Sequence, residues 1–340
     1  MKHSVFYRRL LVAAMALSIT GTALPSFAAD QAATAADATK LQHALDVFAQ
    51  RARPGLLGVS VLDLQTGATA RVNADKAFPM MSVFKAPVAA AVLSRVDDGS
   101  LSLDLPVIIT RDEVQSGSAI PSIGAHFQGE RMTFTVERLL QAAVSESDNT
   151  AVDALIKVIG GPQVVTAFLQ AHGIKGMRVD EDEAGVGRVF RNLSPGQVMP
   201  ANETEEAASQ RYQRGYRAFL ADPRNRSTPD AAVTFLRKLQ GNELLTAAST
   251  RHLLGLMAAQ TIPNRLRAGL PKGLSLADKA GTSGTLDGRT AAYNDIGIVT
   301  WPDGHSVIVA AFLMDATASD AERGALFADL ARAVSAATTP

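Results

Sequence analysis

Strand patterns lie near both ends of this 340-residue chain, and a long helical block separates them. Residues 58–64 alternate apolar and polar side chains, and a turn at 65–67 leads into a second strand at 69–72. Three further strands are predicted after the helical block, at 274–279, 292–301 and 305–314. We therefore expect an α+β fold, with an antiparallel five-stranded sheet flanked by the N- and C-terminal helices, plus an all-helical domain.

The helical block predicts how the chain divides into domains. We place an α/β sheet domain at residues 29–80 and 262–340, and the all-helical domain at 81–261, with the binding groove between them. Helix patterns occupy the segments 39–51, 82–96, 134–143, 149–158, 162–172, 244–259 and 321–336, and another helix opens at 228. Residues 30–38 are expected to form a loose tail. Residues 180–227 show few apolar periodicities, and such a long segment without clear elements is usually functional or mobile.

The first 28 residues have the features of an export signal. Three cations, Lys2, Arg8 and Arg9, precede a short apolar stretch at 10–24, and small residues occupy the positions that a signal peptidase reads. We predict cleavage after Ala28 and a periplasmic or secreted mature protein without a membrane anchor. The alternative is an uncleaved anchor helix, but the stretch is too short and too interrupted to span a bilayer comfortably.

Composition narrows the chemistry that remains. The chain contains 33 Lys and Arg against 33 Asp and Glu, and it contains no cysteine. Balanced charge gives no indication of a nucleic-acid partner. Without cysteine, disulfides, zinc–cysteine sites and cysteine nucleophiles are excluded. We expect no metal and no cofactor, because no metal-binding spacing appears, and no G-x-S-x-G elbow indicates a Ser-His-Asp hydrolase.

Ser82 and Lys85 are the strongest candidates for chemistry. Ser82 opens a predicted helix, where backbone N–H groups are unpaired and the helix dipole is positive. Lys85 lies one turn further on, on the same face, and a neutral lysine there can take the serine proton. Of the nine lysines, only Lys85 has a serine three residues before it. The alternative is an N-cap serine beside a surface lysine.

Two further motifs support a catalytic role for Ser82 and Lys85. Ser147-Asp148-Asn149 begins another predicted helix, where a second hydroxyl and an amide can face the cleft. Lys279-Ala280-Gly281 ends a strand, and the glycine allows a ligand to lie along the strand edge. Each motif alone has a plain alternative, as a helix cap or a strand exit. The order and spacing of all three are hard to explain by chance.

The combination S-x-x-K, S-D-N and K-T-G is the signature of class A β-lactamases and penicillin-binding proteins. The chain resembles a class A serine β-lactamase over nearly its whole mature length, and residues 115–128 and 279–297 most resemble the extended-spectrum PER-type branch. The resemblance implies that Ser82 attacks the lactam carbonyl, that Lys85 helps to deprotonate it, and that Ser147 relays a proton to the leaving nitrogen. Lys279 would orient Ser147.

The same resemblance implies a set of substrate-binding residues. Backbone N–H groups of Ser82 and Thr282 would form the oxyanion hole, and Asn149 would bind the amide side chain of the substrate. Lys279, Thr282 and an arginine would meet the substrate carboxylate, and we favour Arg265 over Arg289. Ser283 is a further hydroxyl at this end. The alternative interpretation of either arginine is a surface charge without a role in binding.

Deacylation requires a carboxylate that activates water. Matching residues 178–183 to the Ω-loop of the family assigns this role to Glu183, with Glu181 as one alternative. The other alternative is an acidic surface loop without a catalytic role.

Four departures from the family pattern affect this region and the lysine–glycine motif. Ala280 replaces a hydroxyl residue, Gly187 replaces a water-holding asparagine, Glu181 and Asn225 cannot form the usual arginine–aspartate pair, and the stretch from Asn149 to Thr228 is long.

We predict an enzyme that hydrolyses small-molecule β-lactams as a monomer. Two alternatives share the acylation machinery. One is a penicillin-binding D,D-peptidase, and the other is a sensor that is acylated with little turnover.

Overall fold

The computed structural model describes residues 26–339, with side chains described from residue 38 onward. The predicted export signal lies outside the described residues, except for its last three residues. These begin helix α1 (Ser26–Arg51), so the expected loose tail at 30–38 is wrong. Repeated alanines favour helix and explain why the helix begins well before residue 39.

One antiparallel sheet forms the centre of the molecule, as predicted. Its strand order is β2 (Thr69–Val72), β1 (Leu56–Asp63), β10 (Ser306–Ala316), β9 (Arg289–Thr300) and β7 (Ser275–Thr282). A short sixth strand, β8 (Thr285–Leu286), pairs with β9. Because Gly58 lies opposite Phe312, the first and last strands are neighbours, and both ends of the chain support the same sheet.

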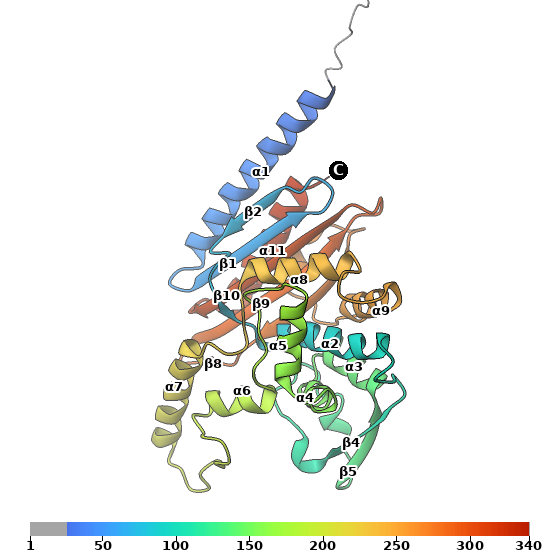
Figure 1. The fold of residues 1–340 in the computed structure, drawn as a ribbon. Coiled ribbons are helices and arrows are strands. Elements are labelled where there is room, and N and C mark those ends of the chain that lie inside the picture. Colours follow the sequence, from blue (N-terminus) through green and yellow to red (C-terminus); the bar gives the residue numbers. More distant parts are fainter. Residues whose placement is uncertain (1–25, 340) are drawn as a thin grey trace, which may run out of the picture.

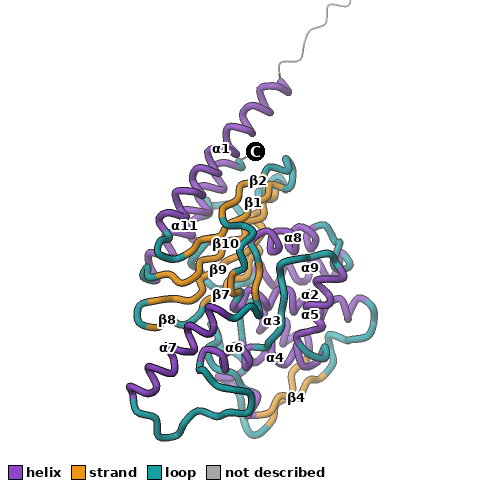
Figure 2. Tube along the Cα trace, turned by 60° about the vertical axis from the view of Figure 1, so that its left-hand side comes forward, coloured by secondary structure: helices purple, strands orange, loops and turns teal. Residues whose placement is uncertain are grey.

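The two faces of the sheet have different covers. α1 and α11 (Asp320–Ala337) lie side by side on one face, and α2, α5, α8 and α9 lie on the side of the opposite face (Figures 1 and 2). α8 (Pro229–Gln240) packs directly on β1 and β10. Strand alternation explains this arrangement, since Val307 and Val309 join the α1–α11 core while Ile308 and Ala310 join the other core.

Six further helical segments of the block lie on the side of the second face. These are η1 (Met81–Phe84), α2 (Lys85–Asp97), α3 (Val136–Val144), α4 (Asn149–Val158), α5 (Pro162–Ala171) and α9 (Ala247–Ala258). The short α10 (Leu266–Gly269) follows the block and packs on α11 instead. The helix predicted from Ser82 starts as a 3₁₀ turn, and its α-helical part begins at Lys85. Pro87 explains the change, because it has no N–H to donate to the Val83 carbonyl.

The block is not entirely helical, which corrects the prediction. β4 (Pro106–Thr110) and β5 (Arg131–Thr135) form a hairpin, and β3 (Phe78–Pro79) pairs with β6 (Arg226–Ser227). Short 3₁₀ turns follow β4 at η2 (Arg111–Glu113) and precede β5 at η3 (Gly124–His126). Burial alternates along β4 although its sequence does not, since Val107, Ile108 and Ile109 are all apolar. One apolar core joins the helices to the sheet, so the division into two domains stays a prediction.

Residues 180–227 contain two helices, α6 (Glu183–Phe190) and α7 (Glu205–Ala221), where no clear elements were predicted. Each begins with a side-chain cap: Asp182 accepts from the Gly185 N–H at 2.7 Å, and Thr204 accepts from the Ala207 N–H at 3.2 Å. α7 lacks a simple apolar pattern because its buried stripe includes Arg211 and Gly215. In the described part of the chain, no single helix is long and apolar enough to cross a membrane, although the bent pair α4–α5 passes that test jointly.

Candidate active site

Lys85 lies at the centre of a buried network. Its ammonium donates to the Ser147 carbonyl at 2.7 Å and to Asn149 Oδ1 at 2.6 Å, and it lies 3.3 Å from Glu183 Oε1. The side chain is 0% exposed, and this burial lowers the pKa of Lys85, while Glu183 opposes the shift. A lowered pKa increases the neutral fraction that can accept a proton. The alternative of a surface lysine is therefore excluded.

Ser147 connects this lysine to a second one. Lys279 donates to Ser147 Oγ at 3.1 Å, and Lys85 Nζ lies 3.4 Å from the same oxygen. Burial, and then the positive charge of Lys85, keep the pKa of Lys279 well below its ordinary value. Ser147 has a backbone φ of 58°, which turns the start of α4 into this position. Three parts of the chain that are distant in sequence thus meet at one hydroxyl.

The edge of β7 lies against the turn that carries Ser82. An ideal Cβ at Gly281 would lie 3.1 Å from the Ser82 nitrogen and 2.6 Å from the Met80 carbonyl oxygen. Only a glycine permits this approach, which explains why the lysine–glycine motif has no side chain there. Thr282, the next residue along β7, lines a cavity.

Arg265, and not Arg289, reaches Thr282. Arg265 donates to Thr282 Oγ1, stacks 4.4 Å from the centre of the Tyr293 ring, and is 5% exposed. Its Nε and Nη1 are buried and have no protein partner. Arg289 instead donates to Asp315 at 2.9 Å.

Two predicted binding residues have internal partners. Ser283 Oγ donates to the Gly284 carbonyl and accepts from the Ala292 N–H, both at 2.9 Å, so its hydroxyl serves the turn after β7. Asn149 Nδ2 donates to the Ser116 carbonyl at 2.8 Å, and one hydrogen of that amide remains for a ligand. Of Thr282 and Ser283, only Thr282 lines the cavity.

The two candidate glutamates point to different partners. Glu183 begins α6 and faces Lys85, whereas Glu181 pairs with Arg224 and lies 3.6 Å from Arg188. Asp153 on α4 holds the start of α6, since its carboxylate accepts from the N–H groups of Glu183 at 2.7 Å and Ala184 at 3.0 Å. Burial raises the pKa of Asp153 well above its ordinary value.

Asn225 fixes the loop in place of the arginine–aspartate pair that is missing. Its side-chain oxygen accepts from the N–H groups of Asp180 at 2.7 Å and Glu181 at 2.9 Å, and its Nδ2 donates to the Glu181 carbonyl at 2.9 Å. The sequence analysis named Asn225 only as a residue that cannot form the ion pair, and it did not identify Asp153. An asparagine with no charge gives no pairing signal, and Asp153 lies in the middle of a predicted helix.

Gln260 is a third residue that the sequence did not reveal. Its Oε1 accepts from Lys279 Nζ at 3.3 Å and from the Ala280 N–H at 3.0 Å, while its amide donates to Asp278. The amide therefore holds the buried lysine from behind. Nothing in the local sequence after α9 distinguishes this glutamine from a surface one.

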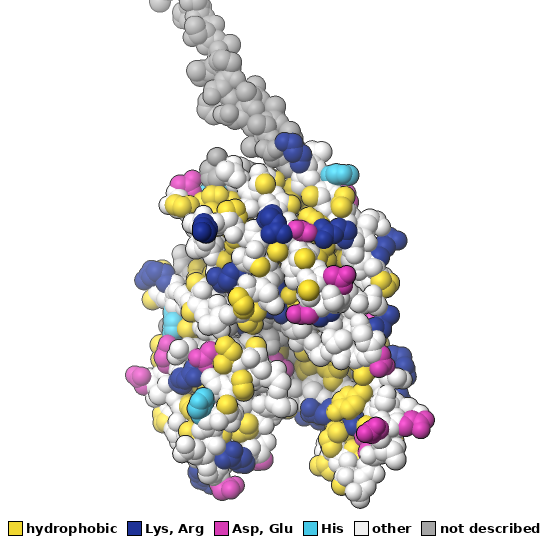
Figure 3. Space-filling model, turned by 180° about the vertical axis from the view of Figure 1, so that it is seen from behind, with side chains coloured by type: hydrophobic (Ala, Val, Ile, Leu, Met, Phe, Trp, Pro, Cys, Tyr) yellow, Lys and Arg dark blue, Asp and Glu magenta, His cyan; other side chains and the backbone are white. Residues whose placement is uncertain are grey.

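Some of these groups line a cavity of about 400 Å³ between the helices and the β7 edge, whereas Lys85, Ser147 and Lys279 are not among its lining residues. Figure 3 shows the molecule hollowed between the lobe that carries α7 and the lobe that carries β4 and β5, with hydrophobic side chains in the hollow. The lining includes the predicted residues Asn149, Glu183 and Thr282. It also includes side chains of α6 and α7, which sequence reasoning did not place here.

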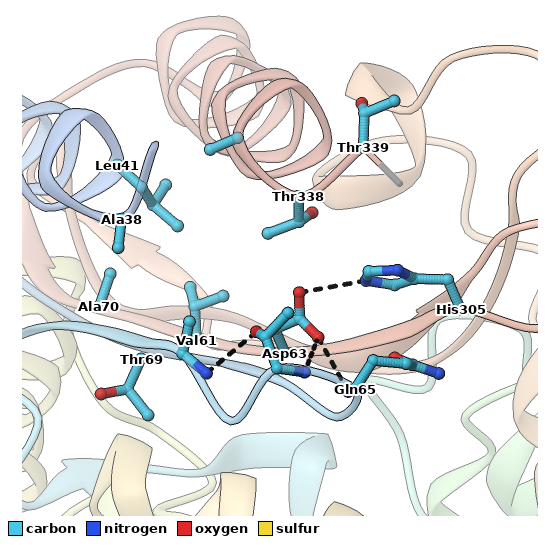
Figure 4. Close-up of a pocket in the computed structure, with 13 residues that line it drawn as sticks. Ala38, Leu41, Val61, Asp63, Gln65, Thr69, Ala70, His305, Thr338 and Thr339 are labelled. Carbon is cyan, nitrogen blue, oxygen red and sulfur yellow. Dashed lines mark hydrogen bonds and ion pairs between the residues drawn. The ribbon is translucent and has the colours of Figure 1, made fainter. Parts of the chain in front are cut away.

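A second cavity, of about 230 Å³, lies between α1, the end of α11 and the β1–β2 turn. Figure 4 shows Asp63 directed toward His305, whose Nε2 lies 3.2 Å from its carboxylate. No predicted site residue lines this cavity. Among the described residues, no three His, Asp or Glu side chains are grouped to hold a metal.

Comparison with known proteins places this site in a family. A model of the β-lactamase enzyme family matches residues 26–338. PER-1 from Pseudomonas aeruginosa is 34% identical over 77% of this chain and 75% of its own, and the β-lactamase L2 of Stenotrophomonas maltophilia is 31% identical over 96% of both. The chain therefore belongs to the β-lactamase enzyme family.

Solved structures agree with this assignment. A β-lactamase from Chitinophaga pinensis has a TM-score of 0.73 at 31% identity, covering 88% of this chain and 99% of its own. An ancestral class A β-lactamase has a TM-score of 0.71 at 33% identity, covering 87% and 99%. The predicted fold class and the resemblance to class A enzymes are confirmed.

Proposed function

We propose that this protein hydrolyses β-lactam antibiotics through an acyl-enzyme on Ser82. The observation that carries the proposal is the convergence of two buried lysines, Lys85 and Lys279, on the Ser147 hydroxyl, beside a carboxylate from α6. Buried cations are costly and persist where their surroundings use them. Relatives named as β-lactamases provide independent support.

Acylation follows from the protonation states of this network. Neutral Lys85 accepts the Ser82 proton as the oxygen attacks the lactam carbonyl, and the carbonyl oxygen is stabilised by the backbone N–H groups of Ser82 and Thr282. As the C–N bond breaks, Ser147 gives its proton to the nitrogen and regains one from a neighbouring lysine. Arg265 and Thr282 hold the substrate carboxylate.

Deacylation uses Glu183 as the general base. The carboxylate removes a proton from a water molecule that attacks the Ser82 ester, and Ser82 is released with its proton restored. The 3.3 Å contact between Glu183 and Lys85 gives the two groups a short path for the return of that proton. Glu181 has no such path because it pairs with Arg224 and Arg188.

Penicillin turnover by the purified mature protein tests the proposal. We expect many turnovers per enzyme, with release of the opened product. One equivalent of bound penicillin without further product, detected by intact-protein mass spectrometry, would refute hydrolysis. That result would instead favour a penicillin-binding peptidase or an acylated sensor, which share the acylation steps.

The place of action and the assembly are part of the same proposal. The charge and apolar pattern of the first 28 residues support export with cleavage after Ala28. The protein acts as a monomer in this proposal. N-terminal sequencing of the exported protein and light scattering of the purified form test the two statements, and a retained leader or a stable dimer would contradict them.

A further inference from the structure

The far part of the active-site cavity has a wall that comes from α6 and α7. Phe190, Arg191, Tyr212 and Tyr216 line this part, and Leu286 of β8 lines it as well. We call these five residues the α6–α7 wall. Apolar and aromatic surface predominates in it, and Arg191 is the one Lys or Arg among all the residues that line the cavity.

Arg191 lacks the partners that neighbouring arginines have. Arg188 lies 3.6 Å from Glu181, and Arg211 lies 2.8 Å from Glu203. Within the described part of the chain, the Arg191 guanidinium forms no ion pair and donates no hydrogen bond. Glu183 lines the same cavity, but its carboxylate lies 3.3 Å from Lys85 Nζ. A planar cation with five free donors therefore faces the cavity.

Gly187 provides the space for this cation. An ideal Cβ at Gly187 would lie 2.9 Å from Arg191 Nη2 and 3.0 Å from Nη1. The guanidinium thus lies back along α6, against the turn that follows Glu183. A side chain at 187 would occupy part of this space. The glycine at 187, where the family has an asparagine, therefore allows Arg191 to lie against α6.

α7 fixes the backbone of this segment. Arg211 Nη1 donates to the Arg191 carbonyl at 2.7 Å, and the rings of Phe190 and Phe219 stack with centres 4.0 Å apart. A Cβ at Gly215 would overlap the Phe190 carbonyl oxygen, so the two helices are in direct contact there. Tertiary packing therefore determines the backbone position of Arg191.

We infer that Arg191 is a specificity-determining residue, which binds an anionic group on the acylamino side chain of the β-lactam. The inference rests on the function proposed above. The carboxylate on the lactam ring system has its own cation at the opposite end, where Arg265 lies beside Thr282. A second anion, carried by the side chain, extends past Asn149 toward α6, while Phe190 and Tyr212 contact the carbon part of that side chain.

Three penicillins with similar side chains test this inference. The side chain of benzylpenicillin is uncharged, that of carbenicillin carries a carboxylate, and that of ampicillin carries an ammonium group. Ceftazidime and cefotaxime add a longer carboxylate and its uncharged counterpart. For Arg191→Gln we expect kcat/KM to fall about tenfold for at least one carboxylate substrate relative to its uncharged partner. Arg191→Glu should lower that ratio further, and it should raise kcat/KM for ampicillin relative to that for benzylpenicillin. Added salt should reduce the wild-type preference.

Arg214→Gln is the matched control, since Arg214 is exposed on α7, does not line the cavity, and loses the same charge. It should leave every ratio unchanged. Equal effects of Arg191→Gln on charged and uncharged substrates, or no effect on either pair, would overturn the inference. If the wild type is acylated without turnover, hydrolysis itself fails, and second-order acylation constants give the same ratios for judging Arg191.

Discussion

The reaction centre and the α6–α7 wall are built by opposite means. Lys85 and Lys279 are both 0% exposed and have most of their hydrogen-bonding capacity used by neighbouring groups. In the wall, Tyr212 is 38% exposed and the Arg191 guanidinium has no described partner. A centre that moves protons needs fixed groups with shifted pKa values. A surface that selects among substrates needs open space and free donors. Because few contacts fix its side chains, its residues can vary without disturbing the reaction centre.

The largest expected effect comes from removing the nucleophile or its base. Ser82→Ala and Lys85→Ala should each lower kcat for penicillin by about four orders of magnitude or more, because both act in one chemical step. The melting temperature of Ser82→Ala should stay close to that of the wild type. Measured turnover within tenfold of the wild type in either variant would contradict the assigned roles.

Glu183→Gln and Glu181→Gln separate the two candidate bases. Loss of a general base costs about 10²–10⁴-fold, so Glu183→Gln should lower steady-state turnover by that amount while the acyl-enzyme accumulates. Glu181→Gln should keep turnover within a few fold, since its carboxylate pairs with Arg224 and Arg188. Rapid-quench mass spectrometry measures the accumulated ester. Accumulation in Glu181→Gln instead would reverse the assignment.

Gly215→Ala tests whether packing against α6 fixes the wall. The added methyl would overlap the Phe190 carbonyl, and such overpacking costs about 1–3 kcal/mol of unfolding free energy. Gly255→Ala in α9 is the matched control, because its Cβ meets nothing within 4 Å and should stabilise by about 0.5–1 kcal/mol. Urea denaturation measures both. Stabilisation by both variants would show that α7 does not press on α6.

The smallest expected effect is a shift in a pH profile. Acylation requires neutral Lys85, so its rate should rise with pH through the lowered pKa of Lys85. Glu183 opposes that lowering, so in Glu183→Gln the rising limb should move to lower pH. Stopped-flow acylation with a chromogenic cephalosporin measures the limb. Glu181→Gln should leave the pH of this rise unchanged. A shift of the rise to higher pH in Glu183→Gln would contradict the interaction between Glu183 and Lys85.

The same lowered pKa values have a consequence for stability. In the unfolded chain Lys85 and Lys279 hold their protons up to about pH 10.5, whereas the folded protein releases them at lower pH. Between these limits the unfolded state binds more protons, so the free energy of unfolding should rise with pH. Lys279→Met should flatten this rise in alkaline denaturation curves.

Patterns that are local in sequence predicted the antiparallel sheet, its two flanking helices and the positions of Ser82, Lys85, Ser147 and Lys279. Strand alternation and spacing along one helix turn depend on few neighbouring residues. β4 and β5 were missed although Val107 and Ile109 face inward, because a short hairpin inside a helical block gives a weak signal. α7 was missed because its buried stripe is interrupted by a charged residue and a glycine.

Only the tertiary structure decided between groups of the same kind. Glu183 and Glu181 are two residues apart and chemically equal, and Asp153 with Arg224 determines which one faces Lys85. Arg265 is the arginine beside Thr282 because Asp315 pairs with Arg289. The sequence by itself determined which chemistry is present and on which elements it lies. The direction of each charged side chain depends on partners far along the chain, and only folding brings those partners into contact.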